Sequence, residues 1–120
     1  MIVETNNVII EVLSGVEDGK IFEFSKFPIT LGRHSSDNLC LSYDKSISRH
    51  HARIVKDDGS FSLEDVGREG KGSTNGTYLN GTRIIGKMLL SSGDTFLIGS
   101  VWLRFKVAND TMAVSQKYVY

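Results

Sequence analysis

Residues 48–65 read SRHHARIVKDDGSFSLED, and this stretch decides the fold that the sequence predicts. Polar and apolar side chains alternate over residues 51–55, and the alternation resumes over residues 61–65. Between them, residues 57–60 hold two aspartates, a glycine and a serine, which are typical of a tight turn. Alternation on both sides of such a turn predicts a β-hairpin. Its first strand directly follows a hydroxyl, a guanidinium and two imidazoles.

The rest of the chain repeats this pattern, with short apolar or β-branched runs separated by Gly, Asn, Asp and Ser. No long stretch has the periodicity of a helix. Asn80-Gly81 is a strong hairpin signal, because both positions of a type I′ turn need a positive φ. The other expected strands lie at residues 8–12, 21–24, 29–31, 39–41, 77–79, 82–85, 95–98 and 101–107. The sequence therefore predicts an all-β fold, an antiparallel β-sandwich of about eleven short strands.

The composition argues against several classes of partner. The chain of 120 residues has the length of one domain, and its 14 basic residues balance its 14 acidic ones. Because nucleic acid and membrane surfaces select a strongly positive protein, we expect neither as a partner. The single cysteine, Cys40, allows no internal disulfide. Glu4 and Glu11 interrupt the first apolar stretch, so we expect no signal peptide and a cytoplasmic location.

Enzymatic and metal chemistry find little support in the pattern. Adjacent His50 and His51 on a strand would point to opposite faces, and no second cysteine or tight carboxylate cluster completes a metal shell. Ser48 and His51 lack an orienting acid and a nucleophile elbow. The glycine-rich residues 67–73 resemble a phosphate loop, but their spacing differs from that motif and no helix follows. We therefore expect no catalysis, no metal and no cofactor.

Hydrogen-bond donors suited to an anion occur at three separate points. Arg33 carries a planar fork that matches a phosphate, and Ser48 and Thr74 add hydroxyl groups. Asn75 both donates and accepts, which suits a peptide main chain better than a phosphate. Each of these residues lies in a turn or at the end of an expected strand, and such loops can gather at one rim of a sandwich.

Plainer interpretations of the same motifs stay open. Gly32-Arg33 alone is more often a strand end with a solvated charge, and Asn75-Gly76 alone is more often a hairpin turn. The two glycines would let the backbone turn sharply, because glycine adopts a positive φ without steric cost. A histidine such as His51 is more often a buried, satisfied imidazole than a ligand contact. We expect it to bond loop backbone and to hold Ser48 in place.

One family combines these motifs in the same order. Forkhead-associated (FHA) domains have Gly-Arg, then Ser-x-x-His, then Asn-Gly, and this chain resembles them at Gly32-Arg33, at residues 48–51 and at Asn75-Gly76. The resemblance covers about residues 6–107, and the strand count is similar to the family's eleven-stranded sandwich. It implies a phosphothreonine-peptide recognition module that does no catalysis and mediates phosphorylation-dependent interactions in signalling. The implied partner is a protein or peptide phosphorylated by a Ser/Thr kinase.

The resemblance also implies a role for each matching residue. Arg33 and Ser48 would hold the phosphate, with Thr74 helping through its hydroxyl or its backbone. Arg49 would contact the same group, and Asn75 would bond the peptide main chain around the phosphothreonine. The residues that would form the scaffold of the site are Gly32, His51 and Gly76.

One departure from the family pattern lies beside the expected groove. Residues 68–72 are inserted between Gly67 and Ser73, where the family usually runs directly from one turn into the next motif. The insertion leaves phosphate binding expected but puts the peptide selectivity in question. Arg68 and Lys71 could attract acidic peptide residues, or they could remain solvated.

We assign residues 1–107 to the FHA-like domain and residues 108–120 to a tail that leads toward a further domain. Within this tail, Tyr118-Val119-Tyr120 either adds an edge strand or frays. Two alternatives to phosphopeptide recognition stay open. The chain could be a phospho-independent interaction β-sandwich with a degenerate phosphate site. It could also be a regulatory module in which Thr5 or Thr111, once phosphorylated, docks in a neighbouring copy and causes self-association.

Overall fold

The computed structural model describes residues 7–67 and 72–108, and these residues form eleven β-strands in two sheets. The described residues contain no helix, and hence no helix that could cross a membrane. The strands are β1 (Val8–Val12), β2 (Ile21–Phe24), β3 (Ile29–Gly32), β4 (Leu39–Cys40), β5 (Ala52–Asp57), β6 (Ser60–Asp65), β7 (Thr77–Leu79), β8 (Thr82–Arg83), β9 (Lys87–Leu90), β10 (Thr95–Ile98) and β11 (Val101–Val107). The all-β fold that the sequence predicts is confirmed.

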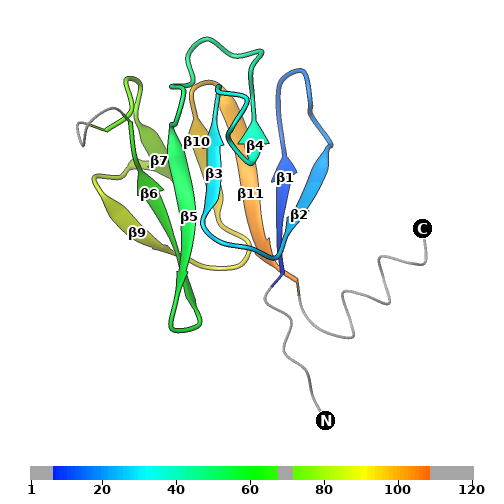
Figure 1. The fold of residues 1–120 in the computed structure, drawn as a ribbon, viewed down its shortest axis with the longest axis vertical. Coiled ribbons are helices and arrows are strands. Elements are labelled where there is room, and N and C mark those ends of the chain that lie inside the picture. Colours follow the sequence, from blue (N-terminus) through cyan, green and yellow to red (C-terminus); the bar gives the residue numbers. More distant parts are fainter. Residues whose placement is uncertain (1–6, 68–71, 109–120) are drawn as a thin grey trace.

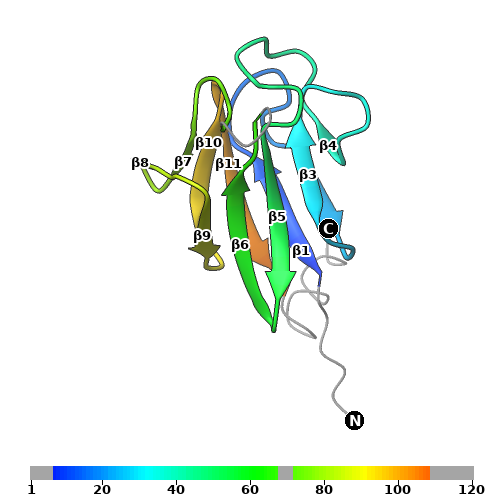
Figure 2. The ribbon, with the colours of Figure 1, turned by 60° about the vertical axis from the view of Figure 1, so that its left-hand side comes forward.

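The two sheets pack face to face as a sandwich (Figure 1 and Figure 2). One sheet has the order β2-β1-β11-β10-β7-β8, and the other has the order β4-β3-β5-β6-β9. Neighbouring strands run antiparallel except β3 and β4, which run parallel. The hairpin expected from residues 48–65 is formed by β5 and β6, with Asp58 and Gly59 at positive φ in its turn. Its first strand, β5, is the central strand of its sheet.

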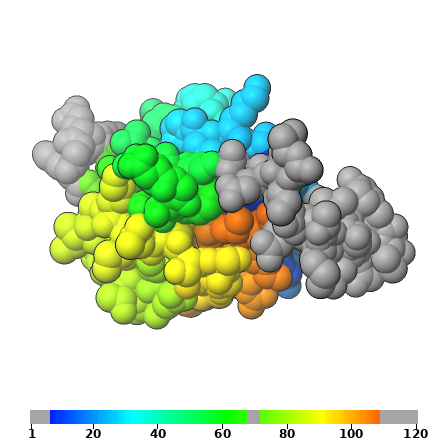
Figure 3. Space-filling model, turned by 90° about the horizontal axis from the view of Figure 1, so that it is seen from below, coloured from blue at the N-terminus to red at the C-terminus, as the bar shows by residue number. Residues whose placement is uncertain are grey.

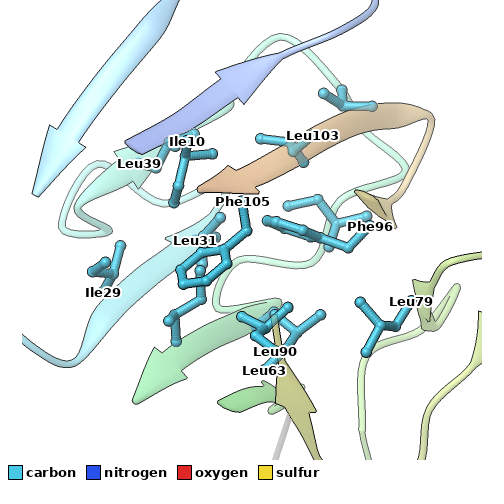
Figure 4. Packing of buried hydrophobic residues seen from close by; sticks show 14 of the residues in the cluster. Ile10, Ile29, Leu31, Leu39, Leu63, Leu79, Leu90, Phe96, Leu103 and Phe105 are labelled. Carbon is cyan, nitrogen blue, oxygen red and sulfur yellow. The ribbon is translucent and has the colours of Figure 1, made fainter. Parts of the chain in front are cut away.

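The core lies between the sheets and is made of apolar side chains from both (Figure 4). Alternation in sequence becomes alternation in burial: along β11, Val101 and Leu103 point into the core, whereas Trp102 faces outward. Burying one such apolar side chain stabilises the fold by about 1.5–3 kcal/mol. The fully buried side chains include Ile10, Ile29, Leu31, Ile54, Leu63, Phe96, Ile98 and Phe105. This close-packed interior gives the loops at the ends of the sheets a rigid base.

The region after β7 differs from the sequence prediction. The sequence predicts one strand over residues 82–85, whereas β8 ends at Arg83 and a separate strand, β9, spans Lys87–Leu90. β9 lacks alternation, since Met88 and Leu89 are both exposed. It forms a strand because it pairs with β6 at the edge of the second sheet. A pairing of this kind is a tertiary contact, which no local pattern reveals.

The connections that carry the expected site residues gather at one end of the sandwich (Figure 1). The two ends of the described domain meet at the opposite end, where the N–H of Ala108 donates to the carbonyl of Asn7 at 2.9 Å. Figure 3 views the molecule from that end, with the β5–β6 hairpin in green and the segment from β9 to β11 in yellow to orange. Residues 109–120 lie outside the described residues, so the tail and its strand at 118–120 stay predictions.

Candidate anion-binding site

At the end of the sandwich opposite to Asn7 and Ala108, the loops enclose an open groove, and we call its two sides banks. The first bank comes from the loop after β3 and the loop before β5, and the second comes from the loop before β7 and from β8. The residues that line the groove are Arg33, His34, Ser48, Arg49, His50, Gly67, Gly72, Ser73, Thr74 and Arg83. Four of the five residues predicted to bind phosphothreonine are among them, and the fifth, Asn75, directly follows Thr74. The fold thus brings together residues that are far apart in the sequence.

Arg33 follows the last residue of β3 and is fixed by two hydrogen bonds to the loop before β5. Its backbone N–H donates to the carbonyl of Ser48 at 3.1 Å, and its Nε–H donates to the carbonyl of Ile47 at 2.9 Å. The two terminal nitrogens of the guanidinium have no acceptor among the described residues. The free side of the fork can therefore bind a ligand beside Ser48.

Gly32 allows this close approach, but the positive φ that the sequence suggested for it is absent. A Cβ on Gly32 would instead collide with the carbonyl oxygen of Arg49 and with the carboxylate of Asp37. The missing side chain makes room for the loop before β5, whose Arg49 carbonyl accepts the N–H of His34 at 3.1 Å. Of the two glycines, only Gly76 has the expected positive φ, at 85°.

The hydroxyl of Ser48 lies between the two banks of the groove. Its Oγ accepts the backbone N–H of Thr74 at 3.1 Å, which joins the loop before β5 to the loop before β7. Because this bond uses an acceptor lone pair, the hydroxyl hydrogen of Ser48 stays free to be donated to an anion. The backbone N–H of Thr74 is already used, so the hydroxyl of Thr74 is the group left to contact a ligand.

The buried imidazole of His51 holds Ser48 in this position. Its Nδ1 accepts the backbone N–H of Ser48 at 3.0 Å, and its Nε2 lies 2.8 Å from the carbonyl oxygen of Gly76. A carbonyl oxygen only accepts, so the ring proton is on Nε2. His51 has 0% exposure, and this burial lowers its pKa although the Gly76 carbonyl favours the protonated form. The neutral ring therefore ties the two banks together.

Asn75 adds a further link between the banks, since its Nδ2 donates to the carbonyl of Ser46 at 2.8 Å. Its Oδ1 and its second amide hydrogen have no partner among the described residues. Ser46 is itself held by Asp44, which accepts the hydroxyls of Ser46 at 2.5 Å and of Ser100 at 2.6 Å. Burial opposes the charged form of Asp44, but these hydrogen bonds outweigh it and lower its pKa to about 2. Asn75 is therefore a loop residue held in place, not part of a hairpin turn.

The insertion in the loop before β7 leaves and rejoins the fold at neighbouring points. Gly67, which precedes the insertion, and Gly72, its last residue, form an isolated parallel bridge. The groove residues that follow the insertion therefore start from a fixed position. Arg68 and Lys71, which the sequence suggested as contacts for acidic peptide residues, lie outside the described residues.

Among the lining residues that were not expected at the site, those with basic side chains are His34, His50 and Arg83. The Nδ1 of His50 lies 2.9 Å from a carboxylate oxygen of Asp37, which is buried. Arg83 lies on β8, and its guanidinium covers Gly76, because a Cβ there would lie 2.7 Å from the Nε of Arg83. The hairpin register, which sets Arg83 opposite Tyr78, is the sequence signal that could have located it.

The part of the chain that forms the groove matches a known family. Residues 29–99 match the model of the FHA domain. The chain belongs to the FHA domain family. One relative of this FHA domain is the oxoglutarate dehydrogenase inhibitor of Corynebacterium diphtheriae, 38% identical over 94 residues, or 78% of this chain and 61% of the relative. Another is the glycogen accumulation regulator GarA of Mycobacterium tuberculosis, 30% identical over 99 residues, or 82% of this chain and 57% of GarA. The chain thus spans about three fifths of these relatives.

Solved structures of other FHA domains have the same fold. The FHA domain of the CT664 protein from Chlamydia trachomatis has a TM-score of 0.71 at 28% identity, over 83% of this chain and 96% of that one. An engineered FHA domain with a Myc-pTBD peptide has a TM-score of 0.73 at 25% identity, over 94% of this chain and 99% of that one. One of these solved FHA domains, with a TM-score of 0.71 at 24% identity, makes phosphothreonine-dependent interactions.

Proposed function

We propose that this FHA domain grips a phosphothreonine of a partner protein between the two banks of its groove. The observation that carries the proposal is the contact of Arg33 with the loop of Ser48, which turns an anchored guanidinium and a free hydroxyl toward the same groove. Arg33 would bind two phosphate oxygens with its terminal nitrogens, and Ser48 would donate its hydroxyl hydrogen. Arg49 on one bank and the hydroxyl of Thr74 on the other would complete the phosphate site.

The charge of a phosphate fits the charge of the groove. A phosphothreonine carries about −1.5 to −2 charges near neutral pH. Arg33 and Arg49 form no ion pair with a carboxylate of the described residues, so their positive charge is available to a ligand. Each hydrogen bond to a charged group contributes roughly 1.5–3 kcal/mol. Three or four such bonds, less the cost of ordering the peptide, give micromolar affinity, about −8 kcal/mol.

Asn75 would bond the peptide main chain next to the phosphothreonine. Its amide is aimed by the hydrogen bond to the Ser46 carbonyl, and one donor and one acceptor are left for the peptide. Gly32, His51 and Gly76 would touch no ligand and would keep the loops in place. This division separates the residues whose loss would weaken binding from those whose loss would weaken the fold.

We infer that the site performs no chemistry on its ligand. Both ring nitrogens of His51 are committed to backbone groups, and neither contacts the hydroxyl of Ser48. A general base must lie within hydrogen-bond reach of the proton that it removes. The serine and the histidine of the motif are therefore arranged for binding and not for nucleophilic attack.

A Ser/Thr kinase would supply the phosphothreonine of the partner, and both proteins would meet in the cytoplasm. The names of the relatives, an inhibitor of oxoglutarate dehydrogenase and a regulator of glycogen accumulation, favour a regulatory role for the whole protein. In such a role the groove would make the contact between regulator and target depend on phosphorylation. We also propose that the phosphopeptide-binding domain extends over residues 1–107.

Calorimetric titration with paired peptides tests this function. A peptide selected from a phosphothreonine library is compared with the same sequence carrying unmodified threonine or phosphoserine. We expect micromolar binding of the phosphothreonine peptide, weaker binding of the phosphoserine peptide and no binding of the unmodified one. Equal binding of the phosphorylated and unmodified peptides would contradict the proposal and favour a phospho-independent β-sandwich with a degenerate phosphate site.

A second candidate is self-association through a phosphorylated end of the chain, and the fold limits how it could occur. Thr5 is two residues from Asn7 and Thr111 is three residues from Ala108, and an extended residue spans at most about 3.6 Å. Asn7 and Ala108 lie at the end of the sandwich opposite to the groove, and the strand β11 alone spans roughly 20 Å. Either threonine would therefore reach the groove of a second copy and not its own.

A further inference from the structure

The five arginines among the described residues fall into two groups. Arg53 and Arg104 each form an ion pair with a glutamate of the neighbouring strand. Arg33, Arg49 and Arg83 form no ion pair with a carboxylate of the described residues, and all three line the groove. The proposed phosphate site uses the first two of these. The charge of Arg83 is then left in the groove without an assigned partner.

The fold holds Arg83 on the bank formed by the loop before β7. Strand β8 pairs with β7 in a register that sets Arg83 opposite Tyr78. The side chain lies against Gly76, where a Cβ would be 2.7 Å from its Nε and 3.0 Å from its Cζ. Gly76 directly follows Asn75, the residue proposed to bond the peptide main chain. A peptide held at Asn75 would therefore pass next to the Arg83 guanidinium.

No contact within the described fold accounts for the charge of Arg83. The residue is exposed, and its guanidinium has no hydrogen-bond acceptor among the described residues. β8 is a strand of two residues at the edge of its sheet, so the side chain supports no core packing. Arg83 lines the groove and also an adjoining hollow that Glu64 and Asp65 line, and it forms an ion pair with neither carboxylate.

We propose that Arg83 forms a second anion subsite, which binds an acidic side chain close to the phosphothreonine in the same peptide. The inference rests on the proposed function, because the phosphothreonine fixes the peptide in the groove. Both a carboxylate and a second phosphate have the chemistry that a guanidinium fork binds. Arg83 lines the same groove as Arg33 and Ser48, and an extended peptide advances about 3.4 Å per residue, so we look for the acidic residue among the nearest neighbours of the phosphothreonine.

The expected gain is modest, because Arg83 is exposed. An ion pair between exposed groups raises an affinity by about two- to fivefold, and salt screens it. Arg83 thus contributes to the choice between phosphothreonine peptides and not to the recognition of phosphate itself. This separates its role from that of Arg33, whose loss should affect every phosphothreonine peptide.

An aspartate scan with matched variants tests the inference by calorimetry. Phosphothreonine peptides with alanine at all flanking positions are compared with peptides that carry one aspartate, or one phosphoserine, within three positions on either side. Each is titrated into the wild type, Arg83→Gln, Arg83→Lys and Lys106→Gln. Lys106 is an exposed cation on β11, near the end of the molecule opposite to the groove, so its variant removes the same charge from a distant place.

We expect one position at which aspartate improves wild-type binding about two- to fivefold, with a larger gain for phosphoserine. Arg83→Gln should abolish both gains and leave the alanine-flanked peptide unaffected, Arg83→Lys should keep part of the gains, and Lys106→Gln should match the wild type. The inference is overturned if no position shows a gain, if the gain survives in Arg83→Gln, or if Arg83→Gln weakens all phosphothreonine peptides equally. Failure of the wild type to bind any of them would instead contradict the proposed function.

Discussion

At the scale of single residues, the groove is built from side chains that divide their hydrogen bonds between the fold and a ligand. Arg33 uses its Nε for the Ile47 carbonyl, and its terminal nitrogens have no acceptor in the described part of the chain. Ser48 uses its oxygen as an acceptor for Thr74 and keeps its hydrogen. His51 differs from both, because its two nitrogens serve the fold alone. Substituting His51 should therefore act on stability first and on binding only through Ser48.

The buried imidazole of His51 makes the stability of the domain depend on pH. Its pKa is lowered by burial, so the unfolded chain, with a histidine pKa of about 6.5, binds the proton more readily than the folded one. The stabilisation is therefore complete above about pH 6.5 and is lost as the pH falls below it, by at most about 1.4 kcal/mol per pH unit. Protonation would also set an N–H of the ring against the N–H of Ser48.

Urea unfolding between about pH 7 and pH 5 measures this dependence, with His51→Gln as the comparison. The variant should be less stable at neutral pH by about 2–6 kcal/mol, since two buried backbone groups can lose their partners. Its stability should change less with pH than that of the wild type. Equal slopes in the two proteins would show that His51 does not titrate as we describe.

At the scale of elements, the site depends on how closely the loop after β3 approaches the loop before β5. The approach requires a glycine at position 32, because a side chain there would strike the Arg49 carbonyl and the Asp37 carboxylate. Asp44 fixes the same loop from the other side through Ser46 and Ser100. The loops are therefore positioned by contacts with each other and with the sandwich, and not by their own turn preferences.

Gly32→Ala should separate these loops and move Arg33 and Arg49 away from Ser48. We expect a loss of about 1–3 kcal/mol in the free energy of unfolding, together with weaker phosphopeptide binding. Gly59→Ala is the matched control, because Gly59 has a φ of 79° but open space around it, in the turn at the other end of β5. It should cost about 1–2 kcal/mol of backbone strain and leave the affinity unchanged. An equal effect of both variants on affinity would contradict the role of Gly32.

Several elements of the fold could be predicted from the sequence, and the exceptions have physical reasons. The alternation along residues 51–65 predicts the β5–β6 hairpin because each strand has one buried face. β9 could not be predicted, since its exposed Met88 and Leu89 hide any alternation and its pairing with β6 is a tertiary contact. The sequence suggests a positive φ as the reason for Gly32, but the actual constraint is the carbonyl of Arg49, which is remote in the sequence.

In the candidate site, the residues of the three motifs could be predicted from the sequence, but Arg83 could not. The order of Gly-Arg, Ser-x-x-His and Asn-Gly indicates the residues that the groove brings together, because each motif also serves the fold. The sequence pattern predicts Arg83 only as part of the strand that follows the Asn80-Gly81 turn. Its place in the groove depends on how its side chain closes over Gly76, which a pattern of apolar and polar residues does not record.

At the scale of the whole molecule, the groove and the two ends of the described domain lie at opposite ends of the sandwich (Figure 1). A peptide in the groove therefore binds far from Asn7 and Ala108, the first and last residues of the described domain. The chain is neutral overall, with 14 basic and 14 acidic residues, so the positive groove is a local feature. This arrangement favours recognition of an external phosphopeptide, or of the end of another copy.

If Thr5 or Thr111 is phosphorylated, the domain should associate with a second copy. Size-exclusion chromatography of the phosphorylated chain should show a dimer or larger species whose amount rises with concentration. Arg33→Ala in the same phosphorylated chain should restore the monomer. The contradicting outcome is a phosphorylated chain that stays monomeric and yet loses its affinity for added phosphopeptide. In that case the phosphothreonine would occupy the groove of its own chain, although the groove and the two ends of the described domain lie at opposite ends of the sandwich.

The most direct test of the phosphate site is calorimetry of Arg33→Ala with a phosphothreonine peptide that the wild type binds. The substitution removes two charge-assisted hydrogen bonds, so we predict a loss of affinity of at least about a hundredfold. Thermal unfolding serves as the control, since only the bond from Nε to the Ile47 carbonyl is lost from the fold. If the folded variant binds the phosphopeptide within about twofold of the wild type, Arg33 does not hold the phosphate and the account is wrong.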